Sequence, residues 1–353
     1  MTAFRHIWIG TGAHDGPDAE GIWRMDRPAP GQGWGARPAT RVLTAERPTY
    51  LALHPSADRL YAVSEGRSGA VVSYTIGADC ALGKRRKVAT GGVGPCHLRV
   101  HPQGQWLYVS NYGDGTLSAV ELTEAGDVSE RVLTYRHSGS GPDRGRQESS
   151  HAHSATLSPG GEFLIVADLG TDELRAYPLE NGRPDSAPVL TTLPPGTGPR
   201  HLAIHGDYLY VTGELSGEVL VLAWNEQDGS AELIQRTPAA TLPGRSADAY
   251  YLSHILIAGG VVLIASRGSD SLSTFTIAED GAHLELTGEV PTAAWPRHMA
   301  VVGSQVLVAG EREDVVVAHP FTPGGEAQGR WSGAVGPEAD RVSIPTPMYV
   351  LPM

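Results

Sequence analysis

The sequence predicts an all-β protein, a seven-bladed β-propeller with four antiparallel strands in each blade. Three observations predict this fold class. One phrase recurs along the chain at a nearly regular interval, each copy contains short runs of alternating apolar and polar residues, and the two ends of the chain supply complementary parts of one further copy. We therefore expect residues 1–353 to form a single domain.

The repeated phrase consists of an alternating apolar run, a tight turn, a second apolar run and a small or polar residue, with a third run after it. Six copies align, at 48–65, 95–111, 151–168, 199–214, 252–267 and 296–311. The third residue of each copy marks the register: Tyr50, His97, His153, His201, His254 and His298. These markers lie about 44 to 56 residues apart, which is typical of a four-stranded blade. Period-two alternation within each run favours strands over helices.

A seventh copy is divided between the ends of the chain. Residues 5–12, 21–25 and 39–45 match the second, third and fourth strands of a blade. Residues 347–352 match the missing first strand, with Met348 as its marker. The last strand of the chain is thus expected to share one blade with the first strand and to close the ring. Closure hides two sheet edges that would otherwise invite aggregation.

Composition narrows the range of partners. The hydrophobic fraction of 41% supports a folded core, and Lys+Arg 27 against Asp+Glu 39 gives a formal charge of −12. We expect no binding to nucleic acid or to anionic membranes, so an anionic ligand needs a local basic cluster. The two cysteines, Cys80 and Cys96, fit neither a disulfide framework nor a metal site, and we expect no metal and no cofactor. The sequence contains no apolar run long enough for a signal peptide or a membrane span, and it therefore predicts a cytoplasmic protein. It does not determine the oligomeric state.

Two columns of residues are expected to surround one mouth of the central channel. The markers begin the innermost strand of each blade, and the second column ends the adjacent antiparallel strand. This second column contains Glu65, Asn111, Asp168, Glu214, Arg267 and Glu311. Because Arg200 and Arg297 directly precede two markers, histidines and arginines gather at the mouth, where an anionic ligand is favoured. Two structural alternatives stay open: a marker histidine could hydrogen-bond the neighbouring blade, and Glu214 could form an ion pair with Arg200 or Arg267.

Four phrases follow one another in a characteristic order: GPCHLRVHPQGQWLYVSNYGDGTL, SHAHSATLSPGGEFLIVADLGTDEL, GPRHLAIH and GELSGEV. Together they resemble the lactonase family of seven-bladed propellers, which includes the propeller type of 6-phosphogluconolactonase and the fungal carboxy-cis,cis-muconate cyclase. The likeness covers nearly the whole chain and is strongest over 91–215. Three places depart from the family pattern. Gly213 stands for an asparagine, Leu252 stands for an acidic residue, and GERED at 310–314 replaces an asparagine-containing turn.

The resemblance implies roles for particular residues. It assigns catalytic roles to His153, Arg200, Glu214 and Arg267. His201, His254 and Arg297 match further positions that the family uses at the mouth, and His151 is the alternative to His153. With three residues added from the two columns, the predicted substrate-binding set is His97, His151, His201, His254, Arg297, Asn111 and Asp168. The polar segment 136–153 is expected to form a partial lid or a solvated loop, with Arg144 and Arg146 as candidate anion contacts.

The resemblance implies hydrolysis of a sugar-type lactone such as 6-phosphogluconolactone, so the expected partner is a small anionic or sugar-like lactone. Glu214 or His153 would activate water as the base, and Arg200 and Arg267 would hold the developing oxyanion and an anionic group. The same residues would serve an isomerase of the muconate type, in which a substrate carboxylate adds across a double bond. A third hypothesis is a non-catalytic propeller that binds a ligand or a protein. Its rim would consist of Trp106, Tyr112 and Trp295.

Overall fold

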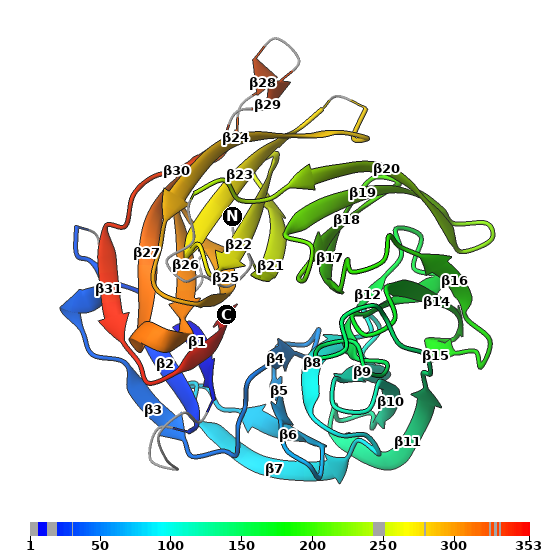
Figure 1. The fold of residues 1–353 in the computed structure, drawn as a ribbon. Coiled ribbons are helices and arrows are strands. Elements are labelled where there is room, and N and C mark those ends of the chain that lie inside the picture. Colours follow the sequence, from blue (N-terminus) through cyan, green and yellow to red (C-terminus); the bar gives the residue numbers. More distant parts are fainter. Residues whose placement is uncertain are drawn as a thin grey trace. The chain divides into compact units, whose positions relative to one another are not determined.

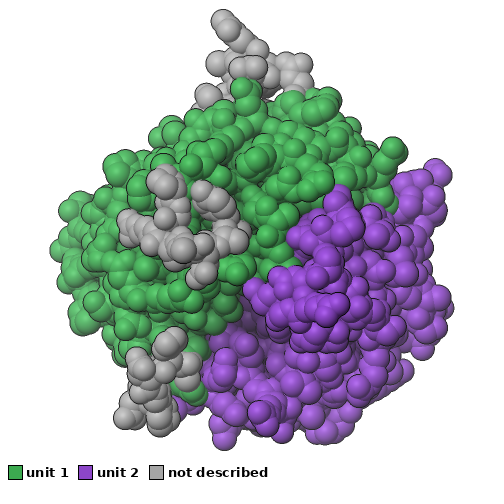
Figure 2. Space-filling model, in the orientation of Figure 1, with its two compact units in different colours: residues 1–41, 200–224, 231–353 green, residues 42–199, 225–230 purple. Residues whose placement is uncertain are grey.

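The computed structural model describes residues 6–12, 20–29, 31–242, 251–278, 280–324, 326–327, 330–331 and 333–353 (Figure 1). Their regular structure is β-strand apart from two short 3-10 helices, η1 (Trp34–Ala36) and η2 (Glu311–Glu313). The strands form seven sheets of four main strands each, and β28 (Glu326–Ala327) pairs with β29 (Arg330–Trp331) as a separate ribbon. The chain divides into two compact units (Figure 2). Unit 1 comprises residues 1–41, 200–224 and 231–353, and unit 2 comprises residues 42–199 and 225–230.

Unit 2 contains three of the sheets, each built from strands that follow one another along the chain. The first consists of β4 (Leu51–Leu53), β5 (Arg59–Ser64), β6 (Ala70–Ile76) and β7 (Leu82–Ala89). The second consists of β8 (Pro95–Val100), β9 (Trp106–Asn111), β10 (Thr116–Leu122) and β11 (Val128–Arg136). The third consists of β12 (Ala152–Leu157), β13 (Phe163–Asp168), β14 (Glu173–Glu180), the short β15 (Arg183–Pro184) and β16 (Val189–Thr192).

The other four sheets belong to unit 1. Three again follow the chain order. The first consists of β17 (Pro199–His205), β18 (Tyr208–Gly213), β19 (Glu218–Asn225) and β20 (Ser230–Pro238). The second consists of β21 (Tyr251–Ala258), β22 (Val261–Arg267), β23 (Ser271–Ile277) and β24 (Leu284–Pro291). The third consists of β25 (Pro296–Val302), β26 (Gln305–Gly310), β27 (Val315–Thr322), the short β30 (Ala334–Val335) and β31 (Asp340–Ser343). The fourth joins both ends of the chain and consists of β32 (Pro347–Pro352), β1 (His6–Thr11), β2 (Ile22–Asp26) and β3 (Thr40–Leu43).

The sheet shared by the two ends confirms the predicted split blade. Strand β32 pairs antiparallel with β1, from Ile7 opposite Pro352 to Gly10 opposite Tyr349. Beyond the ladder, the Gly12 N–H donates to the Thr346 carbonyl at 3.0 Å, and the Thr346 hydroxyl donates to the Gly12 carbonyl. The C-terminal strand therefore supplies one complete edge of hydrogen bonds to the N-terminal strand.

The apolar core lies between neighbouring sheets within each unit. In unit 1 one cluster joins Ile7 and Val350 of the shared sheet to Leu307 and Val316 of the next sheet. Strands β9, β13 and β22 are buried along their whole length, because their sheets are covered on both faces. The strands at the far edge of the sheets, such as β7 and β11, consist mainly of exposed and half-buried residues. The opposite edges of the seven sheets are formed by β4, β8, β12, β17, β21, β25 and β32.

Five of those edge strands, β8, β12, β21, β25 and β32, carry a bulge or irregularity near the predicted marker. In β8, Pro95 lies opposite Asn111 and His97 opposite Ser110, so that Cys96 has no partner in the ladder. In β25 the same shift omits Arg297, between Pro296 and His298. In β32 the shift omits Met348, between Pro347 and Tyr349. A bulge adds one residue to one strand and turns its side chain in a new direction.

These registers correct two of the predicted markers by one residue. In β12 the shift omits His153, so His153 holds the place of Arg297 in β25, and Ser154 holds the marker place. The seventh marker is Tyr349 rather than Met348, which lies in the bulge. The sequence alignment was wrong here because a bulge changes the number of residues between strand start and marker without changing the apolar pattern.

The second column contains the same kind of error. Asn111 pairs with the first residue of β8, and Asp168 pairs with the first residue of β12. In β26 the residue that pairs with the first residue of β25 is Gly310, and Glu311 follows it. Asn111 and Asp168 therefore correspond to Gly310, not to Glu311.

Candidate active site

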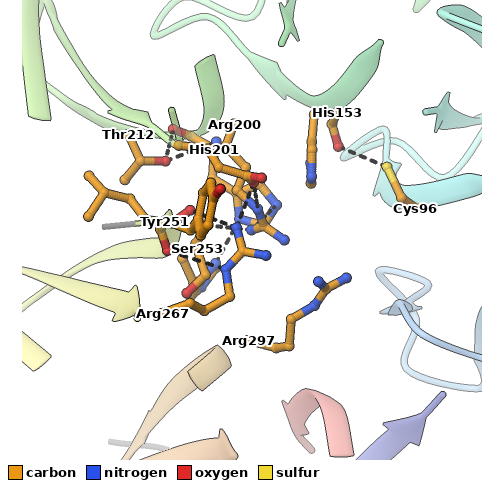
Figure 3. Close-up of polar contacts among 12 residues, drawn as sticks. Cys96, His153, Arg200, His201, Thr212, Tyr251, Ser253, Arg267 and Arg297 are labelled. Carbon is orange, nitrogen blue, oxygen red and sulfur yellow. Dashed lines mark hydrogen bonds and ion pairs between the residues drawn. The ribbon is translucent and has the colours of Figure 1, made fainter. Parts of the chain in front are cut away.

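A buried cluster of one carboxylate and two guanidinium groups lies in unit 1 (Figure 3). Arg200 is the second residue of β17, Glu214 directly follows β18, and Arg267 ends β22. Glu214 Oε2 lies 2.9 Å from Arg200 Nε and 2.6 Å from Arg267 Nη2. The three residues are only 2 to 5% exposed. The structure thus brings together three of the four predicted catalytic residues, and the ion pair that the sequence left open is formed with both arginines.

Backbone carbonyls fix the orientation of both arginines. Arg200 Nη1 donates to the carbonyl of Ser253, whose own hydroxyl donates to the Pro296 carbonyl at 2.6 Å. Arg267 donates from Nε to the Tyr251 carbonyl at 3.3 Å and from Nη2 to the Leu252 carbonyl at 3.1 Å. Ser253 thus connects the sheets of Arg200, Arg267 and Pro296, and it is a positioning residue that the sequence analysis did not identify.

One end of Arg267 is left open. Its hydrogen bonds and its ion pair use Nε and Nη2, so Nη1 has no hydrogen-bond partner among the residues that the structure describes. The guanidinium lies 5.4 Å from the ring centroid of Trp295 and 6.0 Å from that of Tyr251. Burial lowers the pKa of Arg267 below its ordinary value, the Glu214 charge opposes this shift, and the Arg297 charge adds to it. An anion or a developing negative charge beside Nη1 would offset both the desolvation of the Arg267 charge and its repulsion by Arg297.

Arg297 and Glu311 repeat the pair Arg200 and Glu214 in the neighbouring part of unit 1. Arg297 Nε lies 3.5 Å from Glu311 Oε2, and the side chains are 24% and 17% exposed. The corresponding Arg200 and Glu214 side chains are 5% and 3% exposed. Unit 1 therefore contains a closed and a more open version of the same ion pair.

Two histidines of unit 1, His201 and His254, continue from Arg200 as a chain of hydrogen-bonded rings. Arg200 Nη1 lies 3.3 Å from His201 Nε2, and His201 Nδ1 lies 2.9 Å from His254 Nδ1. Because a guanidinium only donates, His201 Nε2 accepts, so that His201 Nδ1 carries the proton and donates to His254. Burial, followed by the Arg200 charge, lowers the pKa of His254 to about 3. The positive charge of this site therefore comes from arginine, and His254, which is neutral and accepts through Nδ1, has a proton on Nε2 to donate.

Two marker histidines form hydrogen bonds to the neighbouring sheet, which is the structural role that the sequence left open. His298 Nδ1 accepts from the N–H of Val350 in the neighbouring sheet at 3.3 Å, and its ring, tilted by 34°, has its centroid 3.8 Å from that of the Tyr349 ring. In unit 2, His97 Nδ1 accepts from the N–H of Ala155 at 3.4 Å. Both rings thus connect neighbouring sheets, which is a reason for a repeated histidine that involves no substrate.

His151 and His153 lie in unit 2 beside Tyr112. The His151 ring stacks 4.5 Å from the Tyr112 ring, and its Nδ1 donates to the Tyr112 carbonyl at 2.7 Å. His153 approaches the same ring edge-on at 5.5 Å, and its carbonyl accepts from Cys96 Sγ at 3.3 Å. That His153 shares one site with Arg200, Glu214 and Arg267 stays a prediction.

Asn111 and Asp168 have structural partners throughout. Both are 0% exposed. Asn111 Nδ2 donates to the Thr116 carbonyl at 2.8 Å, and its Oδ1 accepts from Thr90 at 2.8 Å. Asp168 accepts from the His151 N–H at 2.7 Å and lies 2.7 Å from His137 Nδ1. A substrate contact of these two residues stays a prediction, and their geometry favours a role in holding the sheet.

The segment 136–153 is anchored rather than loosely placed over unit 2. Gln147 is fully buried, and its Nε2 donates to the Leu169 carbonyl at 2.9 Å and to Asp172 Oδ1 at 2.8 Å. Arg146 Nη2 donates to the Tyr112 hydroxyl at 3.4 Å, whereas Arg144 is exposed. The segment thus forms a fixed rim beside Tyr112, and its predicted anion contacts stay a prediction.

Known proteins with a similar sequence or fold decide the family. The model of the family described as Lactonase, 7-bladed beta-propeller matches residues 6–352. The chain belongs to this family. A 6-phosphogluconolactonase of Bacillus subtilis is 31% identical over 279 residues, which cover 76% of this chain and 77% of that protein. The predicted fold class and the predicted class of enzyme, a lactone hydrolase, are confirmed.

Two solved structures are similar to this chain over almost its whole length. A periplasmic gluconolactonase of Pseudomonas aeruginosa is 26% identical with a TM-score of 0.82, covering 99% of this chain and 98% of that one. A protein from Lactobacillus plantarum is 24% identical with a TM-score of 0.83, covering 99% of both chains, and shares the fold. Because one of these relatives is periplasmic by name, the cytoplasmic location stays a prediction.

The residues that the structure describes contain no group of three or more histidine, cysteine or carboxylate side chains that could hold a metal ion. No helix in the described ranges has the length and apolarity needed to cross a membrane.

Glu214→Gln is expected to lower the free energy of unfolding by about 3 kcal/mol, because it leaves two buried guanidinium groups without their common counter-charge. Urea unfolding of the purified lactonase measures this value. Glu218→Gln is the matched control, since Glu218 pairs with Arg236 at 2.6 Å but the arginine is 45% exposed. We expect that control to cost less than about 1 kcal/mol. Equal costs for the two variants would contradict a structural role for Glu214.

Proposed function

We propose that the protein hydrolyses a sugar-type lactone, such as 6-phosphogluconolactone or gluconolactone, at the cluster of Arg200, Glu214 and Arg267 in unit 1. The observation that carries this proposal is the open end of Arg267. A nearly buried guanidinium presents Nη1 without a hydrogen-bond partner among the described residues, and a second arginine acts on it. The substrate class is supported by relatives that are named 6-phosphogluconolactonase and gluconolactonase.

Arg267 is the proposed oxyanion-stabilising residue. Opening a lactone places negative charge on the former carbonyl oxygen, and a donor that is already oriented stabilises this charge most effectively. Arg267 is oriented by two backbone carbonyls and by Glu214. Its Nη1 would donate to the carbonyl oxygen, and this bond would strengthen as the charge develops.

Arg297 is the proposed contact for a hydroxyl, carboxylate or phosphate group elsewhere on the substrate. Its single ion pair uses Nε, so its two terminal nitrogens have no hydrogen-bond partner among the described residues. At 24% exposure the side chain can be reached by a ligand. A guanidinium binds such oxygen groups with two parallel hydrogen bonds.

Glu214 is proposed as a positioning residue and not as the base. Both of its ion pairs use Oε2, and two guanidinium groups favour its ionised form. Removing a proton from water would weaken both ion pairs at a buried site, which opposes the reaction. A different group must therefore activate the water.

The proposed function is tested with a panel of lactones and the purified protein. We expect at least one sugar lactone to be turned over with a kcat/KM of roughly 10⁴ M⁻¹s⁻¹ or more, the lower range of ordinary enzymes. Acid release is followed at constant pH, and the spontaneous hydrolysis of each lactone is subtracted. Muconate-type substrates are included and followed by ultraviolet absorbance. Turnover of these substrates alone would contradict lactone hydrolysis and favour the isomerase.

A further inference from the structure

We infer that Glu311 is the base that activates water in the lactonase. The inference rests on the proposed function and adds a catalytic residue to it. Glu311 belongs to the segment GERED, one of the places where the chain departs from the pattern of the family it resembles. The assignment therefore concerns this chain's own residues.

The argument begins with a repeated pair. The phrase PRH is followed at the same spacing by GE in two sheets of unit 1, giving Arg200 with Glu214 and Arg297 with Glu311. In the first pair the ions are 2.9 Å apart, and the carboxylate also binds Arg267. In the second pair the ions are 3.5 Å apart and more exposed. The same local structure thus gives one carboxylate that is held on two sides and one that is not.

Among the residues that the structure describes, none donates a hydrogen bond to the carboxylate of Glu311. Its Oε2 is buried, yet it accepts no hydrogen bond from the residues that the structure describes. Its ion pair with Arg297 is longer than a good hydrogen bond. Because Arg297 shields the buried Oε2, a water or a substrate hydroxyl would reach this carboxylate, whose side chain is 17% exposed, through its other oxygen, Oε1. A water bound to a carboxylate has the contact that proton removal requires.

The backbone fixes Glu311 beside the arginines. Glu311 begins η2, and its N–H donates to the carbonyl of Trp295 at 3.2 Å. Trp295 has a positive φ of 57°, which is strained for a tryptophan, and its N–H donates to Asp270 at 2.8 Å. Strain of this kind is maintained only where the surroundings enforce it, and it gathers at functional sites.

The charged groups around Glu311 come from three elements. Arg297 lies on β25, Arg267 lies on β22, and Arg312 and Glu313 follow on η2. Arg312 stacks on the Trp295 ring with its Cζ 3.4 Å from the centroid, and Glu313 pairs with Arg341 at 3.0 Å. Burial lowers the pKa of Arg267, and Glu311 is one of the two carboxylates, after Glu214, whose charge opposes this shift. Glu311 is therefore the carboxylate of η2 that acts on the oxyanion site.

The proposed step conserves atoms and charge. Glu311 removes a proton from water as the water oxygen bonds to the carbonyl carbon of the lactone. The electron pair of the carbonyl double bond moves to oxygen, where Arg267 Nη1 donates to it. The intermediate then collapses, the bond between the carbonyl carbon and the ring oxygen breaks, and the proton passes from Glu311 to that oxygen. The products are one hydroxy acid and the regenerated carboxylate.

The test compares Glu311→Gln with Glu313→Gln, a matched control from the same turn. We expect Glu311→Gln to lower kcat by roughly 10² to 10⁴-fold with KM changed by less than about threefold. The fall in activity on the acid side of the pH profile should disappear, because glutamine does not titrate. Glu311→Asp should retain part of the activity, and added formate should partly restore Glu311→Ala. Glu313→Gln should behave as the parent.

Several results would overturn the inference. They are an unchanged kcat in Glu311→Gln, a change in KM alone, or a pH profile whose acid side is removed by His153→Gln and kept in Glu311→Gln. If Glu311→Gln unfolds, the parent protein is treated with a water-soluble carbodiimide instead. Inactivation should then follow modification of Glu311 by mass spectrometry, and modification of Glu311 without loss of activity would refute the role.

The design separates this inference from the proposed function. If the parent protein hydrolyses no lactone, the proposed function itself fails. If the parent is active and Arg267→Ala is inactive, but Glu311→Gln equals the parent, only the role of Glu311 fails. Circular dichroism of each variant shows that the fold is retained.

Discussion

Arg267→Ala is expected to lower the kcat/KM for lactone hydrolysis at least 10³-fold. Removing one oriented donor from an oxyanion site costs about 10² to 10³-fold, and this change also removes the charge beside Arg297 and Glu214. Arg267→Lys keeps a positive charge but cannot bind Glu214 and two backbone carbonyls while presenting a further donor. We therefore expect the lysine variant to be nearly as inactive.

Steady-state kinetics with the best lactone of the panel measure this effect. Arg236→Ala is the matched control, because Arg236 also pairs with a glutamate of unit 1 but is 45% exposed. It should retain parental activity. If Arg267→Ala keeps more than about a tenth of the parental kcat/KM, Arg267 does not stabilise the oxyanion.

Deletion of residues 346–353 is expected to unfold unit 1 at ordinary temperatures. The deletion removes β32, the antiparallel partner of β1, and leaves β1 as an open edge. It also removes Val350, which is 1% exposed, from a core cluster that contains Ile7 and Ile9. Losing one large buried aliphatic side chain alone costs about 2 to 5 kcal/mol, and an ordinary domain is stable by only about 5 to 15 kcal/mol.

Thermal unfolding and size-exclusion chromatography measure the outcome of this truncation. A circular permutant is the control, with the natural ends joined by a flexible linker and new ends placed at the exposed turn near Gln227. It keeps β32, so it should fold. A truncated protein with the parental melting temperature and solubility would show that the shared sheet is not needed for stability.

The fold class was predictable because several local signals agree. Alternating apolar residues and tight turns indicate strands, and a repeat of about fifty residues indicates blades. The split sheet was also predictable, since residues 347–352 supply the strand that the N-terminal copy lacks. Each of these signals depends on side-chain pattern alone, which a sequence displays directly.

The register at the candidate site was not predictable in the same way. A bulge depends on how two backbones pair, and the apolar pattern on either side of it is unchanged. The phrase HAHSA therefore allowed His153 to be taken for a marker, whereas β12 gives that place to Ser154. The neutral state of His254 was equally hidden, because it follows from burial and from the neighbouring Arg200.

The role proposed for Glu311 did have a signal in the sequence. The phrases PRH and GE occur twice at the same spacing, and the second occurrence contains Arg297 and Glu311. What the sequence lacked was the difference in burial between the two pairs, which only the packing of the surrounding strands determines.

The bulged positions bear on how this family can change its chemistry. Cys96, His153, Arg297 and Met348 each lie outside the ladder of hydrogen bonds, so their replacement need not disturb strand pairing. Four different residue types already occupy this place within one protein. A single substitution at such a position changes the side chain while the paired strands stay intact. New substrates can therefore be accommodated, in evolution or by engineering, by changing one blade at a time.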